Sequence, residues 1–404
     1  MLSRKTFLAT SLALGLASLA APVAAQKKYD PGASDTEIKI GQTMPYSGPA
    51  SAYGTIGKVQ AAYFKMLNDQ GGINKRKINF ISLDDGYSPP KTVEMVRRLV
   101  EQDEVLFTMG TLGTPSNTAI HKYMNTKKVP HLFLATGASK WNDPKNFPWT
   151  MGFNVNYQSE GKLYGQDILR TKPNAKIAVL FQNDDYGKDY LKGFKEGLGD
   201  KAKTMIVAEQ TYEVTDPTID SQIVSLKGSG ADTFFNITTP KFGAQAIRKV
   251  AEVGWKPVHY LNQVSSTVGS VLKPAGLENA VGLISMQYIK DPTDPASQND
   301  PVMKDYFAFL KKYAPDVGVD DGNGTYGYAV AQLMEQVLKQ CGDNLTRENI
   351  MKQAASLKKF QVPMAIAGIL ADTGPDDFAP FQTMQLVKFD GKTWVPYGKP
   401  VEVK

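Results

Sequence analysis

Short apolar runs alternate with helical segments along the first half of the chain. Glu37–Met44 has the length and composition of a buried strand, and the apolar residues of Ile56–Leu67 recur every three or four positions, as on a helix with one buried face. A strand at Lys77–Leu83, a helix from Thr92 to about Gln102 and a strand from Val105 continue the alternation. Strands that alternate with helices predict a parallel sheet covered by helices on both faces.

The same order returns in the second half. Strands are expected at Ala175–Phe181, Thr204–Glu209 and Asp232–Ile237, with helices at Lys188–Leu198 and Thr218–Lys227 between them. We interpret this order as a second copy of the βαβαβ unit. Because 404 residues exceed what one hydrophobic core usually supports, we expect an α/β fold with two open lobes.

The C-terminal part follows a different pattern. Tyr326–Gln340 predicts a helix, and Thr346 suits the N-cap of a last helix. From Gln361 onward the tail predicts β structure. It includes a hairpin whose strands, Gln385–Phe389 and Thr393–Val395, flank an Asp-Gly turn.

Two apolar runs of the first half, Val105–Met109 and His131–Ala135, bracket one segment of helix length. Thr114 suits the N-cap of that helix and Pro115 its first position, where the missing amide proton of proline needs no helical partner. The second run ends in the loop Thr136-Gly137-Ala138-Ser139. Parallel strands of one sheet end at the same edge, so we expect the helix start and the loop to converge.

The helix start and this loop together predict a place for a carboxylate. The amides of Ser116 and Asn117 lack acceptors within the helix, and the hydroxyl of Thr114 and the loop at residues 136–139 add further donors. The alternative is that Thr114 only caps its helix and that the loop is an ordinary turn.

The first residues have the pattern of a secretory signal. Arg4 and Lys5 precede an apolar run from Phe7 to Ala20, which is too short for a stop-transfer helix, and small residues place the cleavage site after Ala25. We therefore expect a secreted protein, the alternative being a retained membrane anchor. Without Arg4 and Lys5 the 46 basic residues become 44 against 40 acidic ones, a net charge of +4. These charges form no dense basic run, so no nucleic-acid partner is expected.

The sequence lacks the patterns that are typical of enzymes. The three histidines, His121, His131 and His259, are not at metal-ligand spacing, and no nucleophile elbow or dinucleotide motif follows a strand. The acidic pairs Asp84-Asp85 and Asp184-Asp185 directly follow strands, where solvated or helix-capping carboxylates are usual. We expect no catalysis, no cofactor and no metal, and we interpret His131 as a hydrogen-bonded core histidine.

Five segments carry a likeness to a known family, namely Ser47–Gly54 (SGPASAYG), Asn68–Ile78 (NDQGGINKRKI), Leu83–Val100 (LDDGYSPPKTVEMVRRLV), Gly110–Ile120 (GTLGTPSNTAI) and Asn183–Leu198 (NDDYGKDYLKGFKEGL). Through them the chain resembles the periplasmic leucine/isoleucine/valine-binding proteins, the type I solute-binding components of ABC importers. The resemblance implies two Rossmann-like lobes with parallel sheets, joined by three hinge crossings. It assigns residues 27–152 and 286–360 to lobe 1, and residues 153–285 and 361–404 to lobe 2.

The resemblance also implies a set of ligand contacts. Tyr53 falls on a tyrosine that covers the ligand from the first lobe, and Tyr186 on one that closes over it from the second. Thr114 falls on a serine whose hydroxyl binds the ligand's carboxylate. The loop Thr136-Gly137-Ala138 falls on main chain that completes this grip, although Ala138 lacks the hydroxyl found in the family.

Two departures from the family concern the amino group of its ligands. Thr238 replaces a tyrosine that faces this group, and the acidic residue that pairs with the α-ammonium falls at about Val264-Ser265. An ammonium buried there without its carboxylate partner would be costly by several kcal/mol. We therefore expect a small carboxylate that need not be an α-amino acid, such as an aromatic or hydrophobic acid. Amino acids stay open as ligands, because Glu160 or Asp184 could supply the acidic partner.

The function expected from the resemblance is that of a monomeric solute-binding protein. It would deliver its small carboxylate ligand to the permease subunits of an ABC importer in the inner membrane. The alternative is a periplasmic sensor domain that presents a bound solute to a signalling receptor. The sequence ends shortly after Val403 without a transmembrane helix, which favours transport.

Overall fold

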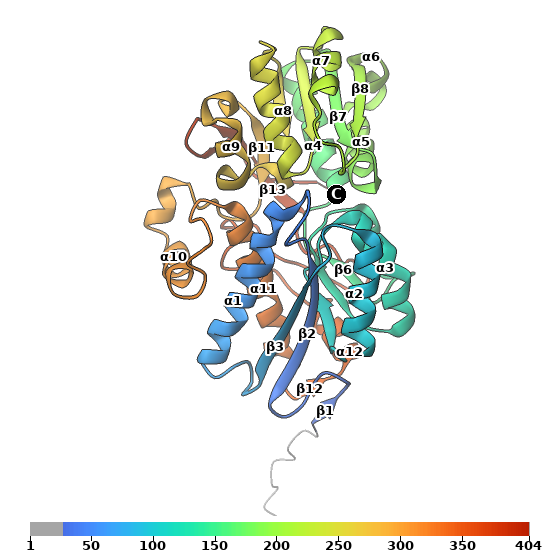
Figure 1. Cartoon of the computed structure of the whole chain (residues 1–404), viewed down its shortest axis with the longest axis vertical. Helices are drawn as coiled ribbons and strands as arrows, with labels where there is room; N and C mark the ends of the chain where they lie inside the picture. Colours follow the sequence, from blue (N-terminus) through green and yellow to red (C-terminus); the bar gives the residue numbers. More distant parts are fainter. Residues whose placement is uncertain (1–26, 404) are drawn as a thin grey trace, which may run out of the picture.

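The protein consists of two lobes stacked along its long axis (Figure 1). The computed structural model describes residues 27–403, and the signal peptide predicted at residues 1–25 lies outside the described residues. Each lobe is a mainly parallel sheet with helices on both faces. This architecture confirms the expected α/β class with two Rossmann-like lobes.

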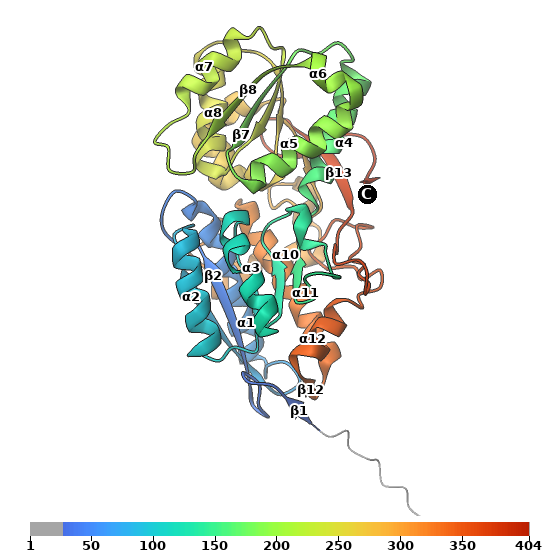
Figure 2. The same cartoon turned by 90° about the vertical axis from the view of Figure 1, so that its right-hand side faces the viewer.

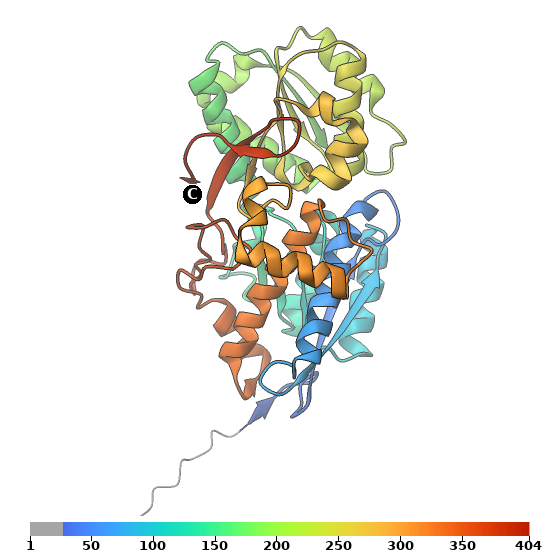
Figure 3. The same ribbon diagram turned by 90° about the vertical axis from the view of Figure 1, so that its left-hand side faces the viewer.

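Lobe 1 contains a five-stranded sheet whose neighbouring strands are all parallel. In spatial order the strands are β3 (Lys77–Asp84), β2 (Glu37–Met44), β4 (Phe107–Met109), β5 (His131–Leu134) and β6 (Thr150–Gly152). Figure 1 shows two helices on one side, α1 (Gly54–Asp69) and α11 (Gly322–Cys341), and two on the other, α2 (Pro89–Glu101) and α3 (Thr114–Lys127). The lobe is completed by α10 (Pro301–Tyr313), drawn in light orange against its side in Figure 3, and by α12 (Arg347–Ala354).

Lobe 2 contains an eight-stranded sheet. In spatial order its strands are β14 (Trp394–Pro396), β13 (Thr383–Phe389), β11 (Ile284–Gln287), β10 (Val258–Leu261), β9 (Thr233–Ile237), β7 (Ile177–Gln182) and β8 (Ile206–Tyr212), and β15 (Val401–Glu402) also pairs with β13. The strands from β8 to β11 are parallel, whereas β13 runs antiparallel to β11.

The predicted duplication is present in the order of the elements. The unit β2-α1-β3-α2-β4 of lobe 1 returns in lobe 2 as β7-α5-β8-α7-β9, with α5 at Asp185–Leu198 and α7 at Asp220–Gly228. The predicted C-terminal hairpin is confirmed, because β13 and β14 pair antiparallel. The β structure predicted for the first part of the tail is wrong. Residues 361–382 contain no strand, and this stretch forms only isolated bridges such as Phe360 with Ala371.

The chain crosses between the lobes three times. The crossings follow β6, follow β11 and precede β13. Figure 2 shows α4 (Tyr157–Thr171), which begins after the first crossing, on the same side of the molecule as β13. Segments that join two compact lobes on one side allow them to hinge about that side.

Glycines bring two helices of lobe 2 into close contact. Helix α4 packs against α5, and both carry glycines four residues apart. A Cβ on Gly161 would lie 2.4 Å from the carbonyl oxygen of Tyr190, and one on Gly193 would lie 2.0 Å from that of Gln158. Only glycine allows the two backbones to approach this closely. The other helices of the lobe are α6 (Ala202–Met205), α8 (Pro240–Glu252) and α9 (Lys273–Ala275).

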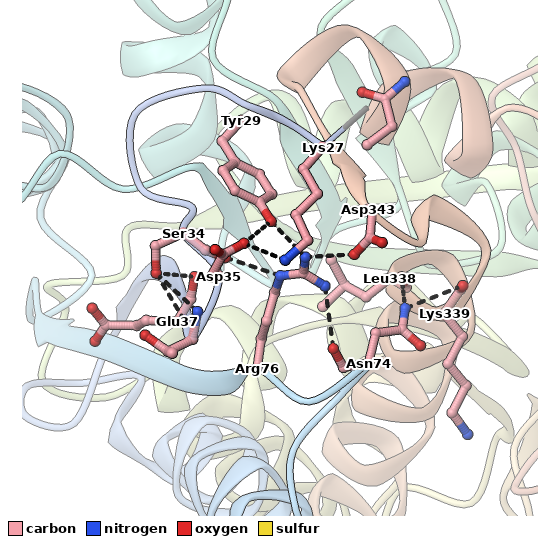
Figure 4. Close-up of polar contacts among 12 residues, drawn as sticks. Lys27, Tyr29, Ser34, Asp35, Glu37, Asn74, Arg76, Leu338, Lys339 and Asp343 are labelled. Carbon is pink, nitrogen blue, oxygen red and sulfur yellow. Dashed lines mark hydrogen bonds and ion pairs between the residues drawn. The ribbon is translucent and has the colours of Figure 1, made fainter. Parts of the chain in front are cut away.

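A buried arginine anchors the N-terminal segment to the far end of lobe 1 (Figure 4). The short strand β1 (Lys28–Tyr29) pairs in parallel with β12 (Asn344–Leu345). Arg76 is 2% exposed and donates hydrogen bonds to four groups, the carbonyls of Ser34 (2.9 Å) and Asn74 (3.2 Å), the hydroxyl of Tyr29 (2.7 Å) and the carboxylate of Asp343 (2.6 Å). The guanidinium therefore connects residues 29–34 to the end of α11.

Candidate functional site

A cleft lies between the lobes, at the carboxyl ends of their parallel strands. It holds about 780 Å³ of empty space, its open mouth included. Its walls carry five tyrosines, Tyr53, Tyr87, Tyr157, Tyr186 and Tyr326. Rings with a polar tip suit a ligand that has both an apolar body and hydrogen-bonding groups.

Lobe 1 brings three of the predicted site residues to this cleft or next to it. Tyr53 and Thr114 line the wall. The hydroxyl of Thr136 lies 2.6 Å from the hydroxyl of Thr114, so the helix start and the loop converge as expected. Ser116 is buried behind them, where its hydroxyl accepts a hydrogen bond from Thr92 (3.0 Å). Gly137 and Ala138 line a second, smaller cavity on the side of the C-terminal segment.

The remaining predicted residues belong to lobe 2. Tyr186 lines the cleft, and its hydroxyl donates to the carbonyl of Thr238 (2.9 Å) and accepts from the side chain of Asn262 (2.7 Å). Thr238 and Ser265 are buried next to the cleft wall, where the Ser265 hydroxyl donates to the Thr238 carbonyl. Their chain neighbours Thr239, Val264 and Ser266 form the wall instead.

The N-cap assigned to Thr114 is wrong. Helix α3 begins at Thr114, so Gly113 is the N-cap residue and Pro115 is the second residue of the helix. Gly113 has a φ of +97°, and a Cβ there would lie 2.6 Å from the ring of Tyr87. Glycine is therefore required at this position, and the Thr114 hydroxyl is left to bond Thr136 and to face the cleft.

Several wall residues were not predicted as part of the site. Tyr87 and Tyr326 reach the cleft from a loop and from the first turns of α11, and the hydroxyl of Tyr326 donates to the side chain of Asn154 (2.6 Å). Tyr157 also lines the cleft, and it is the first residue of α4, just after the first crossing. No local pattern in the sequence distinguishes Tyr326 from a core residue of its helix.

The charged groups of the wall already have partners. Of the described residues that line the cleft, Lys290 and Asp291 alone carry charged side chains. The ammonium of Lys290 pairs with Asp300 at 2.5 Å. The carboxylate of Asp291 accepts hydrogen bonds from the amide of Thr293 (2.7 Å) and the side chain of Gln287 (2.9 Å), while burial raises its pKa. Neither side chain is held ready for a ligand of opposite charge.

The two acids considered as alternative partners for an ammonium are also occupied. Glu160 accepts from the hydroxyls of Tyr164 (2.8 Å) and Tyr190 (2.7 Å) and from the amide of Gln263 (2.7 Å). Burial raises the pKa of Glu160 to about 7. Asp184 caps helix α5 by accepting from two of its first amides. Neither residue belongs to the cleft wall.

The lobes touch on both sides of the cleft. The hydroxyl of Tyr53 donates across the cleft to the carbonyl of Val264 (3.1 Å). Ser139 donates its amide and its hydroxyl to Asp189 of α5, both at 2.8 Å. On another side the amide of Gly269 donates to the carbonyl of Asp320 (3.1 Å). These contacts describe a closed arrangement of the two lobes.

Two kinds of feature are absent from the described part of the chain. Within residues 27–403 no helix is long and apolar enough to cross a membrane. The same residues contain no group of three or more histidine, cysteine, aspartate or glutamate side chains that could hold a metal ion.

Comparison with known proteins identifies the family. The model of a family described as periplasmic binding protein matches residues 37–393. The Leu/Ile/Val-binding protein homolog 1 of Brucella suis is 27% identical over 344 residues, which cover 81% of this chain and 85% of that protein.

Two solved structures share the fold. A branched-chain amino acid ABC transporter protein of Thermus thermophilus with bound valine has a TM-score of 0.81 and 16% identity, covering 91% of this chain and 97% of that one. A solute-binding protein of an ABC transporter from Rhodopseudomonas palustris, in complex with 3,4-dihydroxybenzoic acid, has a TM-score of 0.76 and 19% identity, covering 91% and 98%. The chain therefore belongs to the periplasmic binding protein family, as a type I member of its leucine/isoleucine/valine-binding group, whose proteins bind solutes without catalysis.

Proposed function

We propose that the protein binds a small carboxylate with an uncharged, preferably aromatic body and delivers it to an ABC importer by closing its lobes. The observation that carries this proposal is the distribution of charge in the cleft. Neutral hydrogen-bond donors and tyrosine rings form the wall, and the acidic groups in and around it are already paired.

The anionic end of the ligand has a suitable place at the start of α3. The hydroxyls of Thr114 and Thr136 lie together there. The amide of Asn117, which was expected to be free, donates to the carbonyl of Gly113 (3.0 Å), and Pro115 has no amide proton, so the amides of Thr114 and Ser116 are the ones left for an anion. The positive end of the helix dipole adds a favourable field for a negative charge. This set of donors supports a carboxylate without requiring a cationic side chain.

The rest of the ligand would face the tyrosines. Tyr53 and Tyr186 come from opposite lobes, so a ring between them would be covered on both sides after closure. An α-ammonium would have to lie near Val264 or compete with Thr293 and Gln287 for Asp291. The desolvation cost of an unpaired ammonium therefore disfavours α-amino acids.

The solved neighbours support a carboxylate ligand in general. Valine and 3,4-dihydroxybenzoic acid, the ligands named for the two structures, are both small carboxylic acids. They differ in whether an ammonium accompanies the carboxylate. The pairing of Asp291, Glu160 and Asp184 favours the second type for this chain.

Closure would couple binding to delivery. Contacts such as that between Tyr53 and Val264 join the lobes only when the cleft is shut. A ligand that contacts both lobes shifts the equilibrium toward this state, which a permease in the inner membrane would then recognise. Secretion into the periplasm belongs to the same proposal.

Calorimetric titration of the purified protein with benzoate, 4-hydroxybenzoate, cinnamate, leucine and valine tests the proposal. We expect binding of at least one aromatic acid and weaker or no binding of the two amino acids. Tight leucine binding without any response to the aromatic acids would refute the ligand class.

The position of the anion is tested by replacing Thr114 and Thr136 together with valine. We expect affinity to fall by roughly 10- to 100-fold, since hydrogen bonds to charged groups contribute about 1.5–3 kcal/mol. Thr126→Val is the matched control, because its exposed hydroxyl bonds only the preceding turn of α3. Unchanged affinity in the double variant would place the carboxylate elsewhere.

A further inference from the structure

Asn154 lines both the cleft and the second, smaller cavity. It belongs to the first crossing, between β6 and α4, and is 9% exposed. Thr114 lines the cleft and Thr136 lines the second cavity, and the hydroxyls of these two residues lie 2.6 Å apart. Asn154 is therefore a neighbour of the hydroxyl pair to which the proposed function assigns the ligand's carboxylate.

A tyrosine of lobe 1 fixes the orientation of the Asn154 side chain. The hydroxyl of Tyr326, in α11, donates to Oδ1 of Asn154 at 2.6 Å. The oxygen end of the amide is thus turned toward α11. The Nδ2 atom carries two protons and makes no hydrogen bond within residues 27–403. This atom is not fully enclosed either, so it borders the cavities that Asn154 lines.

The unpaired nitrogen is a donor that a ligand can use. Buried polar groups are nearly always hydrogen-bonded, so an amide that is nine-tenths buried and lacks a partner for its protons calls for an explanation. The neighbouring hydroxyls leave acceptor sites of an anion open. One of the protons of Thr114 and Thr136 is used in the bond between them, whereas each oxygen of a carboxylate accepts about two hydrogen bonds.

We infer that the side-chain amide of Asn154 donates to the ligand's carboxylate, and that Tyr326 is the positioning residue that keeps the nitrogen end of this amide available. The inference rests on the proposed function and adds a donor to its anion site. An amide supplies its protons without a positive charge, as do the hydroxyls beside it. Through this contact the ligand would bind directly to one of the three segments that join the lobes.

The bond from Tyr326 gives the site a preference for acceptors. If the amide were reversed, its oxygen would face the ligand and repel a carboxylate, and the proton of Tyr326 would lose its acceptor. A ligand that presents a hydroxyl instead of a carboxylate gains less from the amide protons, because bonds to charged groups are the stronger ones. The affinities for benzoate and benzyl alcohol therefore report on this contact.

Asn154→Asp replaces the amide nitrogen by an acceptor of similar size that can still accept from Tyr326. We expect the affinity for benzoate to fall by at least about 100-fold at pH 8, since a hydrogen bond to a charged group is lost and a like charge is added. The affinity for benzyl alcohol should be kept or rise, because its hydroxyl can donate to the new carboxylate. An equal fall for both compounds, or a benzoate affinity within about threefold of the wild type, would overturn the inference.

The pH dependence of this variant separates direct contact from a structural role. Two carboxyl groups in contact hold one proton between them, so the variant should take up a proton when benzoate binds. Relative to the wild type, its affinity should recover by up to about tenfold for each pH unit from pH 8 to pH 6. Glu160 titrates in both proteins, so the comparison cancels its effect. A ratio of affinities that stays constant over this range would overturn the inference.

Two more variants complete the test. Asn174→Asp is the matched control, since it adds the same charge at an exposed position before β7, at the end of the strand that is remote from the cleft. Tyr326→Phe removes the proton that orients Asn154, so the ratio of benzoate to benzyl alcohol affinity should fall about twofold to tenfold, the range for one neutral hydrogen bond. An unchanged ratio in Tyr326→Phe would overturn its positioning role.

A crystal of the wild type grown with 4-bromobenzoate gives a test that does not depend on the folding of a variant. A carboxylate oxygen within about 3.2 Å of Nδ2 of Asn154 supports the inference, and a carboxylate bound elsewhere in the cleft overturns it. That second result would leave the proposed function intact. A wild type that binds none of the carboxylates would overturn both.

Discussion

The contact between Gly269 and Asp320 allows closure to be tested away from the ligand. Gly269 lies in a π-helical turn of lobe 2, Val268–Leu272, and Asp320 lies just before α11 of lobe 1. A Cβ on Gly269 would lie 2.8 Å from Oδ1 of Asp320 and 3.1 Å from the carbon and oxygen of its carbonyl. Gly269→Ala therefore places a methyl group between the lobes, and it does so only when they are closed.

The size of the effect follows from the overpacking. Contacts of this closeness cost roughly 1–2 kcal/mol, because the Asp320 side chain can turn away only by disturbing its ion pair with Lys273, and its backbone must shift. Each 1.4 kcal/mol that destabilises the closed state weakens ligand binding by about tenfold if the open state predominates in the free protein. We expect Gly269→Ala to bind its carboxylate ligand about fivefold to thirtyfold more weakly, with the folding stability of each lobe unchanged.

Calorimetry and small-angle X-ray scattering provide the assays. The variant should need more ligand to reach the compact scattering profile of the bound wild type. Gly228→Ala is the control, because a Cβ at this position of α7 would meet no atom within 4 Å. If Gly269→Ala matches this control in both affinity and scattering, the contact with Asp320 is not specific to the closed state.

Three further predictions concern stability, and urea unfolding measures each of them. Burial lowers the pKa of His259 to about 3, whereas the unfolded chain binds the proton with a pKa of about 6.5. Between pH 7 and pH 5 the free energy of unfolding of the wild type should therefore fall by about 2 kcal/mol more than that of His259→Gln. Equal pH dependence of the two proteins would contradict this. Gly193→Ala should destabilise lobe 2 by about 3 kcal/mol or more, because its Cβ would lie 2.0 Å from the carbonyl of Gln158. A decrease in the free energy of unfolding below about 1 kcal/mol would mean that α4 and α5 can move apart to accept the methyl group. Arg76→Met should cost about 1–3 kcal/mol and expose residues 29–34 to limited proteolysis, whereas wild-type resistance would show that the β1 and β12 pairing suffices.

The fold was predictable where the local pattern and the tertiary structure agree. The alternation of strands and helices identified both βαβαβ units, and His131 is a buried core histidine whose Nε2 lies 2.8 Å from both Thr111 and Asn117. The β structure predicted for residues 361–382 is absent, and the stretch forms only isolated bridges. Pro363, Pro375 and Pro380 interrupt it, and proline cannot donate the amide hydrogen bond that a continuous strand needs.

The candidate site was predictable in its location but not in all of its members. Thr114 and the loop after β5 converge because parallel strands end at one edge. Gly113, and not Thr114, is the N-cap residue of α3, and it contacts the ring of Tyr87, which comes from another loop. Tyr326 reaches the cleft from a helix that is far from Tyr53 in the sequence. Such contacts follow from tertiary structure and leave no periodic signal.

The part of the cleft wall at Gln263 and Val264 of lobe 2 joins the two lobes without a charged side chain. At Val264, near the position where the resemblance implies an acid for the α-ammonium, the chain instead offers a carbonyl to the hydroxyl of Tyr53. The nearby acid, Glu160, lies behind the wall, where it accepts from the amide of Gln263 and from the hydroxyls of Tyr164 and Tyr190, and burial raises its pKa to about 7. Glu160 thus fixes the loop that receives Tyr53, while its carboxylate is occupied by these three donors and does not line the cleft. A ligand with a single negative charge and no ammonium meets the least electrostatic opposition there, which is the physical reason to expect aromatic or hydrophobic acids ahead of amino acids.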